Sequence, residues 1–168
     1  MAAEMTVEVF QVKNEDAEFE KLKQELEDKE TRSSQELVMQ TNIRNFSKGR
    51  VHQIERHFWH GRTLTNYPPL PVNTGVNTRQ QGTLPQGVKF GMVYADGDDT
   101  TARKFVVAFD SPAGKAYAEA GPIGPVDWNV VEVKLGMAGK KTEYNDNILG
   151  GRVVAEMSGV NAFATFYN

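Results

Sequence analysis

After Arg32 the sequence alternates between apolar and polar residues, and glycine or proline interrupts this alternation roughly every ten to fifteen residues. An alternation with a period of two places successive side chains on opposite faces of a β-strand, and glycine and proline mark the turns between strands. The part after residue 36 has about 130 residues, which is enough to bury a core between two sheets. We therefore predict a mostly β protein, built as an antiparallel β-sandwich over residues 37–168.

Residues 37–44 and 50–58 are the first pair of expected strands. They flank a turn segment, residues 45–49, that ends in a glycine able to adopt a positive φ. This arrangement predicts a hairpin. A competing interpretation begins a helix at Ser33, with Glu36 as its capping-box partner.

Residues 88–95 and 102–109 are the clearest hairpin in the sequence. Large apolar residues recur at every second position and so share one face in each segment: Val88, Phe90, Met92 and Tyr94 in the first, and Phe105, Val107 and Phe109 in the second. An Asp-Gly-Asp-Asp turn joins the two segments. Three shorter segments with the same pattern are expected to be strands as well: residues 116–120, 153–157 and 162–167.

Residues 66–87, between the two predicted hairpins, contain four prolines and many Asn, Thr, Gln and Gly residues. This composition predicts a long loop. Loops of this length in a compact domain usually carry a function or wrap the edge of a sheet.

Residues 1–36 are an acidic N-terminal extension, with eleven acidic and five basic residues. Asn14 is a suitable N-cap ahead of acidic residues in a first helical turn. Three apolar residues then recur at helical spacing: Phe19, Leu22 and Leu26. We predict one amphipathic helix over residues 14–30. Because its apolar stripe is only three residues wide, this helix needs a surface on which to dock.

Residues 127–137 are compatible with a second, shorter helix. Asp127 can cap it, and Trp128, Val131 and Leu135 then share one face. Three valines in this stretch would suit a strand equally well, since β-branched residues favour extended backbone. Both interpretations stay open, and we favour the helix.

The composition of the chain excludes several classes of function. It has 19 Lys and Arg residues against 22 Asp and Glu, a balance that does not indicate nucleic-acid binding. Without cysteine it can form no disulfide framework and no thiolate zinc site. No apolar stretch reaches the roughly 18 residues of a membrane span, and the acidic start does not look like a secretory signal. We expect a soluble protein of the cytoplasm or the nucleus.

Three histidines, His52, His57 and His60, lie close together in the sequence and raise the question of a metal site. On a strand the first two would point to opposite faces about 16 Å apart, too far to share an ion. No serine lies in a Gly-x-Ser-x-Gly elbow, and no phosphate loop or calcium loop is complete. We therefore expect no metal, no cofactor and no enzymatic activity.

The segment 44–79 carries six basic residues against one acid, a local charge of +5, and aromatic residues lie between them. Basic groups beside amphipathic rings suit lipid headgroups, phosphorylated partners or glycans. Two simpler explanations remain open: the rings fill the core while the basic residues face solvent, or the acidic helix covers the basic surface in the same molecule. The residues that we predict to bind a ligand are Arg44, Arg50, Arg56, Trp59, His60, Arg62 and Tyr67.

A succession of short motifs runs through residues 37–166: Trp59-His60-Gly61, Tyr67-Pro68, Val93-Tyr94-Ala95, a strand over 105–109 followed by Asp110-Ser111-Pro112, Ala116-Tyr117-Ala118-Glu119, and then Trp128, Val131 and Leu135. In order and spacing this succession resembles the jasmonate-induced proteins of plants. The resemblance implies a stress- or hormone-responsive protein with no catalytic residues. It also implies a sandwich fold similar to the actinoporin-like lipid-binding proteins of fungi and sea anemones.

The sequence departs from this pattern in two places. Residues 76–84 hold no tryptophan where the relatives carry a second one, which weakens an inherited binding surface. The predicted helix over residues 14–30 carries eight acidic residues. Each charge at the centre of a bilayer costs about 2.5 to 3.5 kcal/mol on insertion scales, so we do not expect this helix to form pores.

These features together predict a non-enzymatic plant stress-response protein that binds a lipid headgroup, a glycan or another anionic ligand. The loop over residues 59–71 and the neighbouring arginines would form the site. The alternative is a structural or protein-interaction module in which the acidic N-terminal helix docks a protein partner. Neither hypothesis involves nucleic acid or a transmembrane segment.

Overall fold

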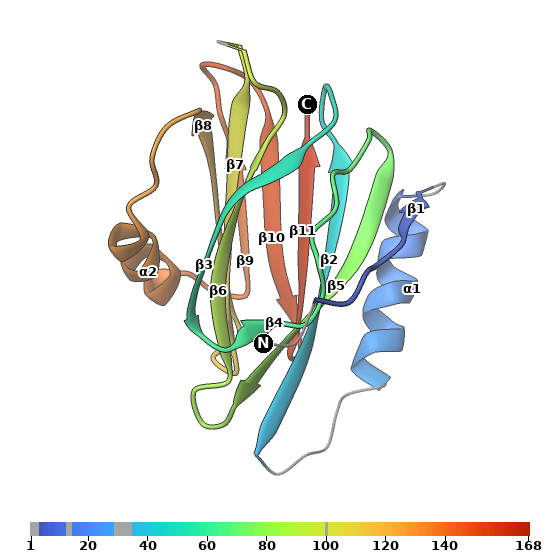
Figure 1. The fold of residues 1–168 in the computed structure, drawn as a ribbon, viewed down its shortest axis with the longest axis vertical. Helices are drawn as coiled ribbons and strands as arrows, with labels where there is room; N and C mark the ends of the chain where they lie inside the picture. Colours follow the sequence, from blue (N-terminus) through green and yellow to red (C-terminus); the bar gives the residue numbers. More distant parts are fainter. Residues whose placement is uncertain (1–3, 13–14, 29–34, 100) are drawn as a thin grey trace.

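The computed structural model describes residues 4–12, 15–28, 35–99 and 101–168, and two β-sheets stacked as a sandwich account for most of this part of the chain (Figure 1). The large sheet has the strand order β1, β5, β2, β11, β10 and β9, with the short β4 paired to β5. Its strands are β1 (Val9–Gln11), β2 (Glu36–Phe46), β4 (Arg62–Thr63), β5 (Thr74–Thr83), β9 (Lys141–Asn145), β10 (Arg152–Ser158) and β11 (Asn161–Tyr167). All of its pairs are antiparallel except β2 with β11, which run parallel.

The small sheet has the antiparallel order β3, β6, β7, β8. Its strands are β3 (His52–His60), β6 (Val88–Ala95), β7 (Arg103–Ser111) and β8 (Lys115–Pro122). The two sheets bury a core rich in aromatic rings, and Phe90, Tyr94 and Phe166 are fully inaccessible to solvent. The predicted fold class, a mostly β sandwich, is therefore confirmed.

One helix covers each outer face of the sandwich (Figure 1). The helix α2 (Trp128–Met137) packs on the small sheet, where Val131 and Leu135 join a second apolar cluster with side chains of β6 and β7. The strand β7 is therefore apolar on both faces, since Phe105 points into the sandwich and Val106 points toward α2. The helix α1 (Glu15–Asp28) lies on the large sheet.

Both predicted helices are confirmed, within the limits of the described residues. Asp127 caps α2 by accepting hydrogen bonds from the backbone N–H groups of Asn129 and Val130, so the helical alternative for this segment is correct. The predicted N-cap of α1, Asn14, and the side chain of Leu26 lie outside the described residues.

The predicted pairing of the first hairpin is wrong. The two strands exist as β2 and β3, but β2 lies in the large sheet and β3 in the small one, where β3 pairs with β6. The segment between them crosses from one sheet to the other, and the Asn45 side chain holds it by donating to the carbonyls of Gly49 and Leu70. A turn signal shows where a chain reverses, and it does not decide which sheet the next strand joins. The competing helical interpretation is wrong from Glu36 onward, because β2 starts there, and Ser33 lies outside the described residues.

The predicted loop over residues 66–87 is also wrong in part, because it contains the ten-residue strand β5. The inward positions of β5 include Thr78 and Gln80, which are polar but fully buried. Gln80 accepts a hydrogen bond from the Thr41 hydroxyl at 2.8 Å and donates to the Tyr67 hydroxyl at 2.9 Å. These interior hydrogen bonds replace apolar contacts, so the strand lacks the apolar alternation by which sequence patterns reveal strands.

Candidate functional site

The seven residues predicted to bind a ligand do not form one surface. Arg44 lies on the outer face of β2, is 4% exposed, and is covered by α1, with its guanidinium 4.0 Å from the centre of the Phe19 ring. It also donates to the Thr165 hydroxyl at 3.2 Å. Arg50 is exposed in the connection between β2 and β3. The helix therefore covers part of the basic segment within the same molecule.

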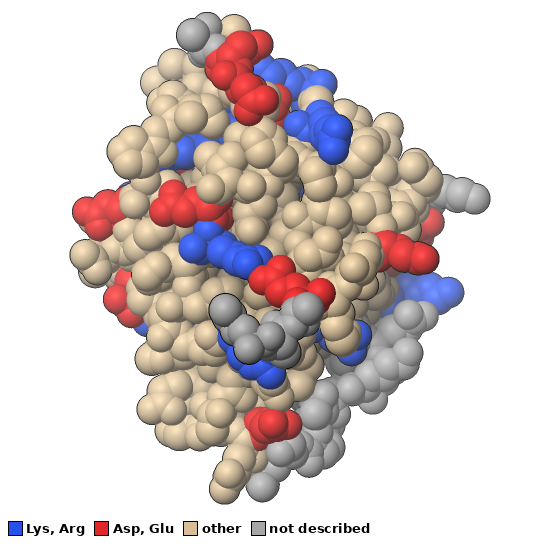
Figure 2. Space-filling view, viewed as in Figure 1, with Lys and Arg blue, Asp and Glu red and all other residues tan. Residues whose placement is uncertain are grey.

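Arg56 and Tyr67 lie together, but the charge of Arg56 is already paired with a carboxylate of the same chain. Arg56 forms an ion pair of 2.6 Å with Glu4, and its guanidinium lies 5.2 Å from the centre of the Tyr67 ring. Burial raises the pKa of the Tyr67 hydroxyl above its ordinary value, so this group is neutral at physiological pH. Figure 2 shows acidic and basic side chains interspersed over this face of the molecule. The local +5 of the sequence does not appear there as a patch of one sign.

The remaining three residues, Trp59, His60 and Arg62, line one open hollow of about 560 Å³. It lies at the end of the sandwich where β3 ends and β4 begins, at the bottom of Figure 1. We call it the corner hollow. Its other lining residues are Glu36, Gly61, Gln81, Gly82, Thr83, Gln86 and Gly87.

Close backbone contacts, which require glycine, build the corner hollow. A Cβ atom at Gly82 would lie 1.8 Å from the carbonyl oxygen of Gly87. The end of β5 can therefore approach the start of β6 this closely only where residue 82 has no side chain. Gly61 turns the chain from β3 into β4 with a φ of 90°, a value that L-residues with side chains rarely adopt. These positions bring the end of β3 against the turn between β5 and β6.

The corner hollow offers one aromatic ring and a set of polar groups. Arg62 donates to the side-chain oxygen of Gln81 at 2.8 Å, which orients both side chains along the rim. Thr83 and Gln86 are exposed and also line the hollow. Hydroxyl, amide, imidazole and guanidinium groups can donate or accept hydrogen bonds from many directions, and a tryptophan ring offers a flat apolar face.

A second hollow of about 350 Å³ adjoins the first, since His60 and Gln86 line both. The lysine and carboxylate on this second side are Lys89 and Asp110. Together the two hollows form a continuous polar surface around His60, which is exposed.

Trp59 is only partly available to a ligand, because it also supports α2. Its ring meets the Trp128 ring edge to face, with centres 5.9 Å apart, and His57 lies against both rings. The ammonium group of Lys89 lies 5.6 Å from the centre of the Trp59 ring. The indole is thus held in one orientation at the boundary between the α2 contact and the corner hollow.

The three histidines are separated by this arrangement. His52 lies 3.5 Å from a carboxylate oxygen of Asp98, His57 stacks on Trp128, and His60 borders the corner hollow. In the described part of the chain, no group of three His, Cys, Asp or Glu side chains lies close enough to hold a metal ion.

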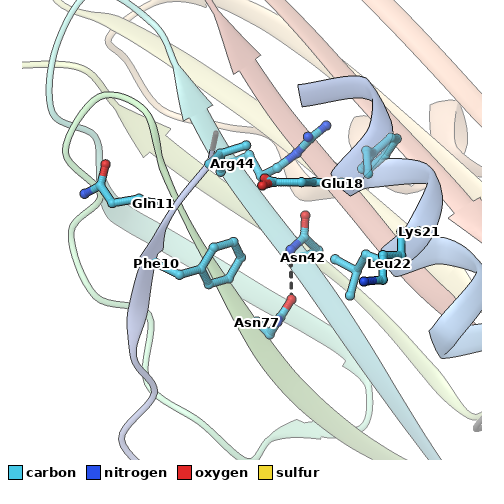
Figure 3. A pocket seen from close by; sticks show the side chains of 10 residues that line it. Phe10, Gln11, Glu18, Lys21, Leu22, Asn42, Arg44 and Asn77 are labelled. Carbon is cyan, nitrogen blue, oxygen red and sulfur yellow. Dashed lines mark hydrogen bonds between the residues drawn. The ribbon is translucent and has the colours of Figure 1, made fainter. Parts of the chain in front are cut away.

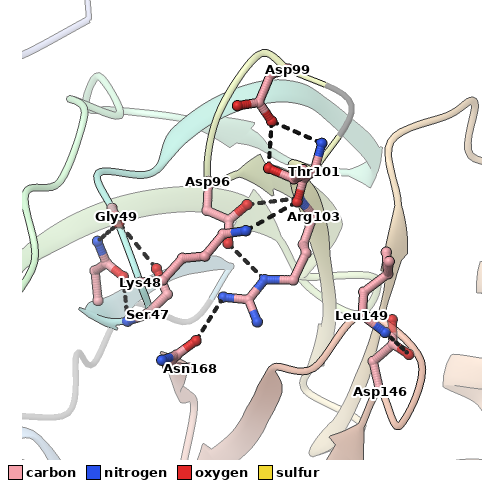
Figure 4. Close-up of polar contacts among 11 residues, drawn as sticks. Ser47, Lys48, Gly49, Asp96, Asp99, Thr101, Arg103, Asp146, Leu149 and Asn168 are labelled. Atoms are coloured by element: carbon pink, nitrogen blue, oxygen red, sulfur yellow. Dashed lines mark hydrogen bonds and ion pairs between the residues drawn. The ribbon is translucent and has the colours of Figure 1, made fainter.

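Two carboxylates of the acidic turn between β6 and β7 interact with neighbouring residues of the same hairpin (Figure 4). Asp96 forms a buried ion pair of 2.8 Å with Arg103, and the two side chains are 0% and 3% exposed. Asp99 accepts two hydrogen bonds from Thr101, which hold the pKa of its carboxyl below the ordinary value. These carboxylates therefore stabilise the hairpin, as the simpler interpretation of the Asp-Gly-Asp-Asp turn expects.

Sequence reasoning missed the residues that complete the corner hollow, notably Gln81, Gln86 and Glu36. Gln81 and Gln86 belong to the segment that was predicted to be a loop, and Glu36 was assigned to the N-terminal extension. A glutamine- and glycine-rich stretch is a weak signal by itself. Only the pairing of β5 with β2 and β4 brings these side chains next to Trp59.

No protein-family profile and no curated protein sequence matches the chain. Among solved structures, it is similar to the lipid binding protein Nakanori, with a TM-score of 0.68 and 11% identity over 90% of this chain and 78% of that one. It also matches a lectin of Xerocomus chrysenteron, with a TM-score of 0.48 and 13% identity over 78% of this chain and 99% of that one. The first likeness supports the assignment of a shared β-sandwich fold. Within the described residues, neither helix is long and apolar enough to cross a membrane.

Proposed function

We propose that this chain is a non-enzymatic binding protein whose corner hollow recognises a sugar ring, carried either by a free glycan or by the headgroup of a glycolipid. The observation that carries the proposal is the convergence of one tryptophan with several amide, hydroxyl and charged groups around one open hollow. An aromatic face stacks on the C–H face of a sugar, while the polar groups around it exchange hydrogen bonds with the ring hydroxyls.

The groups at the rim are suited to such a ligand. His60 ends β3 and Arg62 begins β4, while Gln81 of β5 and Gln86 of the turn after β5 line the same hollow. A set of mixed donors and acceptors fits hydroxyl groups better than it fits a phosphate, which would need several cations together. The likeness to a lipid binding protein supports a binding role for this fold. A glycolipid would combine both ligand types, because its headgroup is a sugar and its tail is a lipid.

The resemblance to the jasmonate-induced proteins extends the proposal to its setting. On that basis the chain is a plant protein of stress or hormone responses. Its place in the cytoplasm or the nucleus, without a cofactor, is proposed from the composition and the motifs of the sequence. The resemblance rests on the order and spacing of the motifs over residues 37–166 and is independent of the geometry of the corner hollow.

The test is a titration of the protein with a panel of soluble glycans and with vesicles that contain or lack a glycolipid, at low and at physiological salt. Tryptophan emission reports binding, because Trp59 lines the hollow. We expect a saturable blue shift with one class of sugar. Binding of the soluble glycan alone identifies a glycan as the source, and binding only of glycolipid vesicles identifies a headgroup.

Matched arginine variants test the location of the site. Arg62→Glu should weaken binding about tenfold or more, because it removes a charged donor from the rim. Arg50→Glu, an equal charge change at an exposed arginine that does not line the hollow, should leave the affinity unchanged. Circular dichroism checks that both variants fold. Equal losses in the two variants, or no loss in Arg62→Glu, would contradict the assignment of the hollow.

A second candidate function is protein binding through α1, and one observation favours it. The docked helix leaves Glu20 exposed, with its side chain 72% accessible. A basic partner could therefore contact α1 without displacing it. Replacing Glu20 by glutamine should then weaken capture of such a partner and leave sugar binding unchanged, as a pulldown and the titration above would show.

A further inference from the structure

A second cavity lies on the other side of the molecule, between α1 and the large sheet. It has a volume of about 380 Å³ and lies outside the corner hollow, with which it shares no lining residue. Figure 3 shows it bounded by β1 on one side, by α1 on the other, and by β2 and β5 beneath. We call it the α1 cavity.

Apolar side chains form the walls of the α1 cavity. Phe10 projects from β1, and Leu22 projects from α1 across from it (Figure 3). Phe19 of α1 also lines the cavity. All three are half-buried rather than enclosed, so they line the cavity without filling it. Cavities of 300 to 1,000 Å³ with mainly apolar walls and a few polar groups are typical of small-molecule sites.

The floor of the α1 cavity is a pair of amides from neighbouring strands. Asn42 on β2 is opposite Asn77 on β5, and its Nδ2 donates to the Asn77 Oδ1 at 2.8 Å. The other end of the cavity is polar, with Glu18 and Arg44 in its lining. The floor and one end of the α1 cavity are therefore polar, and Phe10, Phe19 and Leu22 form its apolar walls.

The Oδ1 atom of Asn42 is buried and accepts no hydrogen bond from the described residues. The whole residue is inaccessible to solvent. In Figure 3 this oxygen points away from Asn77, toward the end of the cavity formed by Arg44 and Glu18. Nearly all buried carbonyl groups in folded proteins have a donor, so an orphaned one that lines a cavity points to a missing partner.

We propose that the α1 cavity binds a small, mainly apolar molecule that carries one hydrogen-bond donor, a hydroxyl or an N–H group, directed at Oδ1 of Asn42. The apolar body would contact Phe10 and Leu22, and the donor would satisfy the buried acceptor. This site is separate from the corner hollow and does not depend on the function proposed for that hollow.

A matched pair of probes tests this recognition. Indole carries an N–H donor, and 1-methylindole has the same ring system without it. Each probe is titrated into isotope-labelled protein while the amide resonances are recorded by NMR. We expect saturable shifts confined to the cavity, at Phe10, Leu22, Asn42 and Asn77. Indole should bind about three- to tenfold more tightly than 1-methylindole, because one hydrogen bond to a buried acceptor distinguishes them.

Two variants locate the effect. Asn42→Leu removes the acceptor and should abolish the preference for indole while retaining binding of both probes. Because this change also removes the hydrogen bond to Asn77, a second variant is needed that leaves the floor intact. Leu22→Trp fills the cavity from α1 and should weaken both probes at least tenfold. Gln24→Trp, the same replacement at an exposed position of α1 that does not line the cavity, is the control.

The possible results separate clearly. Localised shifts with a preference for indole, lost in Leu22→Trp and kept in Gln24→Trp, would establish the site. Equal affinity for the two probes would overturn the role of Asn42 Oδ1 and leave a bound water as its partner. The absence of saturable shifts, or shifts that Leu22→Trp does not change, would overturn the cavity as a binding site.

Discussion

The two helices cover opposite faces of the same sandwich, but they are held in different ways. The helix α2 inserts Val131 and Leu135 fully into an apolar cluster, and each is at most 2% exposed. Its first residue, Trp128, lies over Gly91 of β6 and donates from its indole to Glu55 at 2.7 Å. A salt bridge of 2.7 Å between Lys89 and Glu132 closes the contact at the edge.

The helix α1 rests on a polar face. Among its described side chains none is fully buried, and its main anchor is Phe19. This ring lies against Arg44 and meets Phe163 edge to face, with ring centres 5.0 Å apart. Lys23 adds a longer contact of 3.4 Å to Glu156. The α1 cavity remains beside this anchor.

This comparison shows that a regular apolar stripe does not by itself decide how firmly a helix docks. In the sequence, α1 has the more regular apolar stripe. The helix α2 is shorter and places apolar residues on several faces, with Val133 63% and Met137 81% exposed. The difference lies in the sheet below. The outer face under α2 is apolar, with Val93, Val106 and Ala108, and the face under α1 carries Asn42 and Arg44.

The largest effect should come from the anchor of α2. Leu135→Ala leaves a cavity between α2 and the small sheet, and we expect it to lower the free energy of unfolding by about 2 to 5 kcal/mol. Urea denaturation followed by circular dichroism measures this loss. A loss no greater than that of Phe19→Ala would break the comparison, because α2 would then be no better anchored than α1.

The next effect tests the contact of Trp128 with β6. A Cβ atom at Gly91 would lie 2.4 Å from a ring carbon of Trp128, so Gly91→Ala must push this ring outward. We expect a loss of about 1 to 3 kcal/mol in unfolding free energy, together with a red shift of tryptophan emission. Gly136→Ala is the control, since a Cβ there meets nothing within 4 Å and alanine favours the helix. An unchanged emission spectrum in Gly91→Ala would show that the ring does not sit on this glycine.

A smaller effect is expected at the anchor of α1. Phe19→Ala removes a half-buried ring and its contact with Arg44, and we expect a loss of about 1 to 2 kcal/mol. Hydrogen exchange should show the amides of α1 losing protection while those of β2 and β11 keep theirs. The exposed neighbour Glu20→Ala should change the unfolding free energy by less than about 0.5 kcal/mol. Loss of protection in the core strands as well would mean that α1 supports the whole sandwich.

The smallest effect is a pH dependence on the α2 side. Burial, and then the negative charge of Glu119, raise the pKa of Tyr117, which packs against the apolar cluster beneath α2. Because the folded pKa exceeds the unfolded value of about 10, the unfolded state loses this proton first as the pH rises. The stabilisation is therefore complete below pH 10 and declines above it.

Tyr117→Phe removes this ionisation, so its stability should fall less between pH 9 and pH 11 than that of the parent protein. The difference should stay below about 1 kcal/mol, because the hydroxyl is partly exposed and solvent screens its charge. Urea unfolding at fixed intervals of pH provides the measurement. Parallel stability curves for the two proteins would contradict the assigned role of Tyr117.

The sequence predicted those strands in which large apolar residues recur at every second position. The hairpin of β6 and β7 has the expected strands and turn, and its register pairs Phe90 with Phe109. The last two strands were also predicted, as β10 and β11. In these segments the local pattern and the tertiary contacts require the same alternation, so the pattern alone was sufficient.

The candidate site could be predicted only in part. Trp59, His60 and Arg62 are consecutive or nearly so, and the sequence could therefore group them. Arg44 carries the same charge as Arg62 and belongs to the same basic segment. Its side chain, however, points to the outer face of β2, where α1 covers it. The partners Gln81 and Gln86 reach the hollow only through strand pairing, which no local pattern specifies.

The sequence by itself determined the β-rich class, the helix α1 and the turn between β6 and β7, because each of these depends on side-chain periodicity or backbone preference within a few residues. It left residues 127–137 open between a helix and a strand. The tertiary structure decided which sheet each strand joined, which polar residues became interior, and where the corner hollow and the α1 cavity formed. Those outcomes depend on contacts between distant segments, such as the pairing of Arg62 with Gln81 and the pairing of Asn42 with Asn77. Such contacts leave no periodic trace in one sequence, since a polar residue buried with a partner looks the same as a polar residue in solvent.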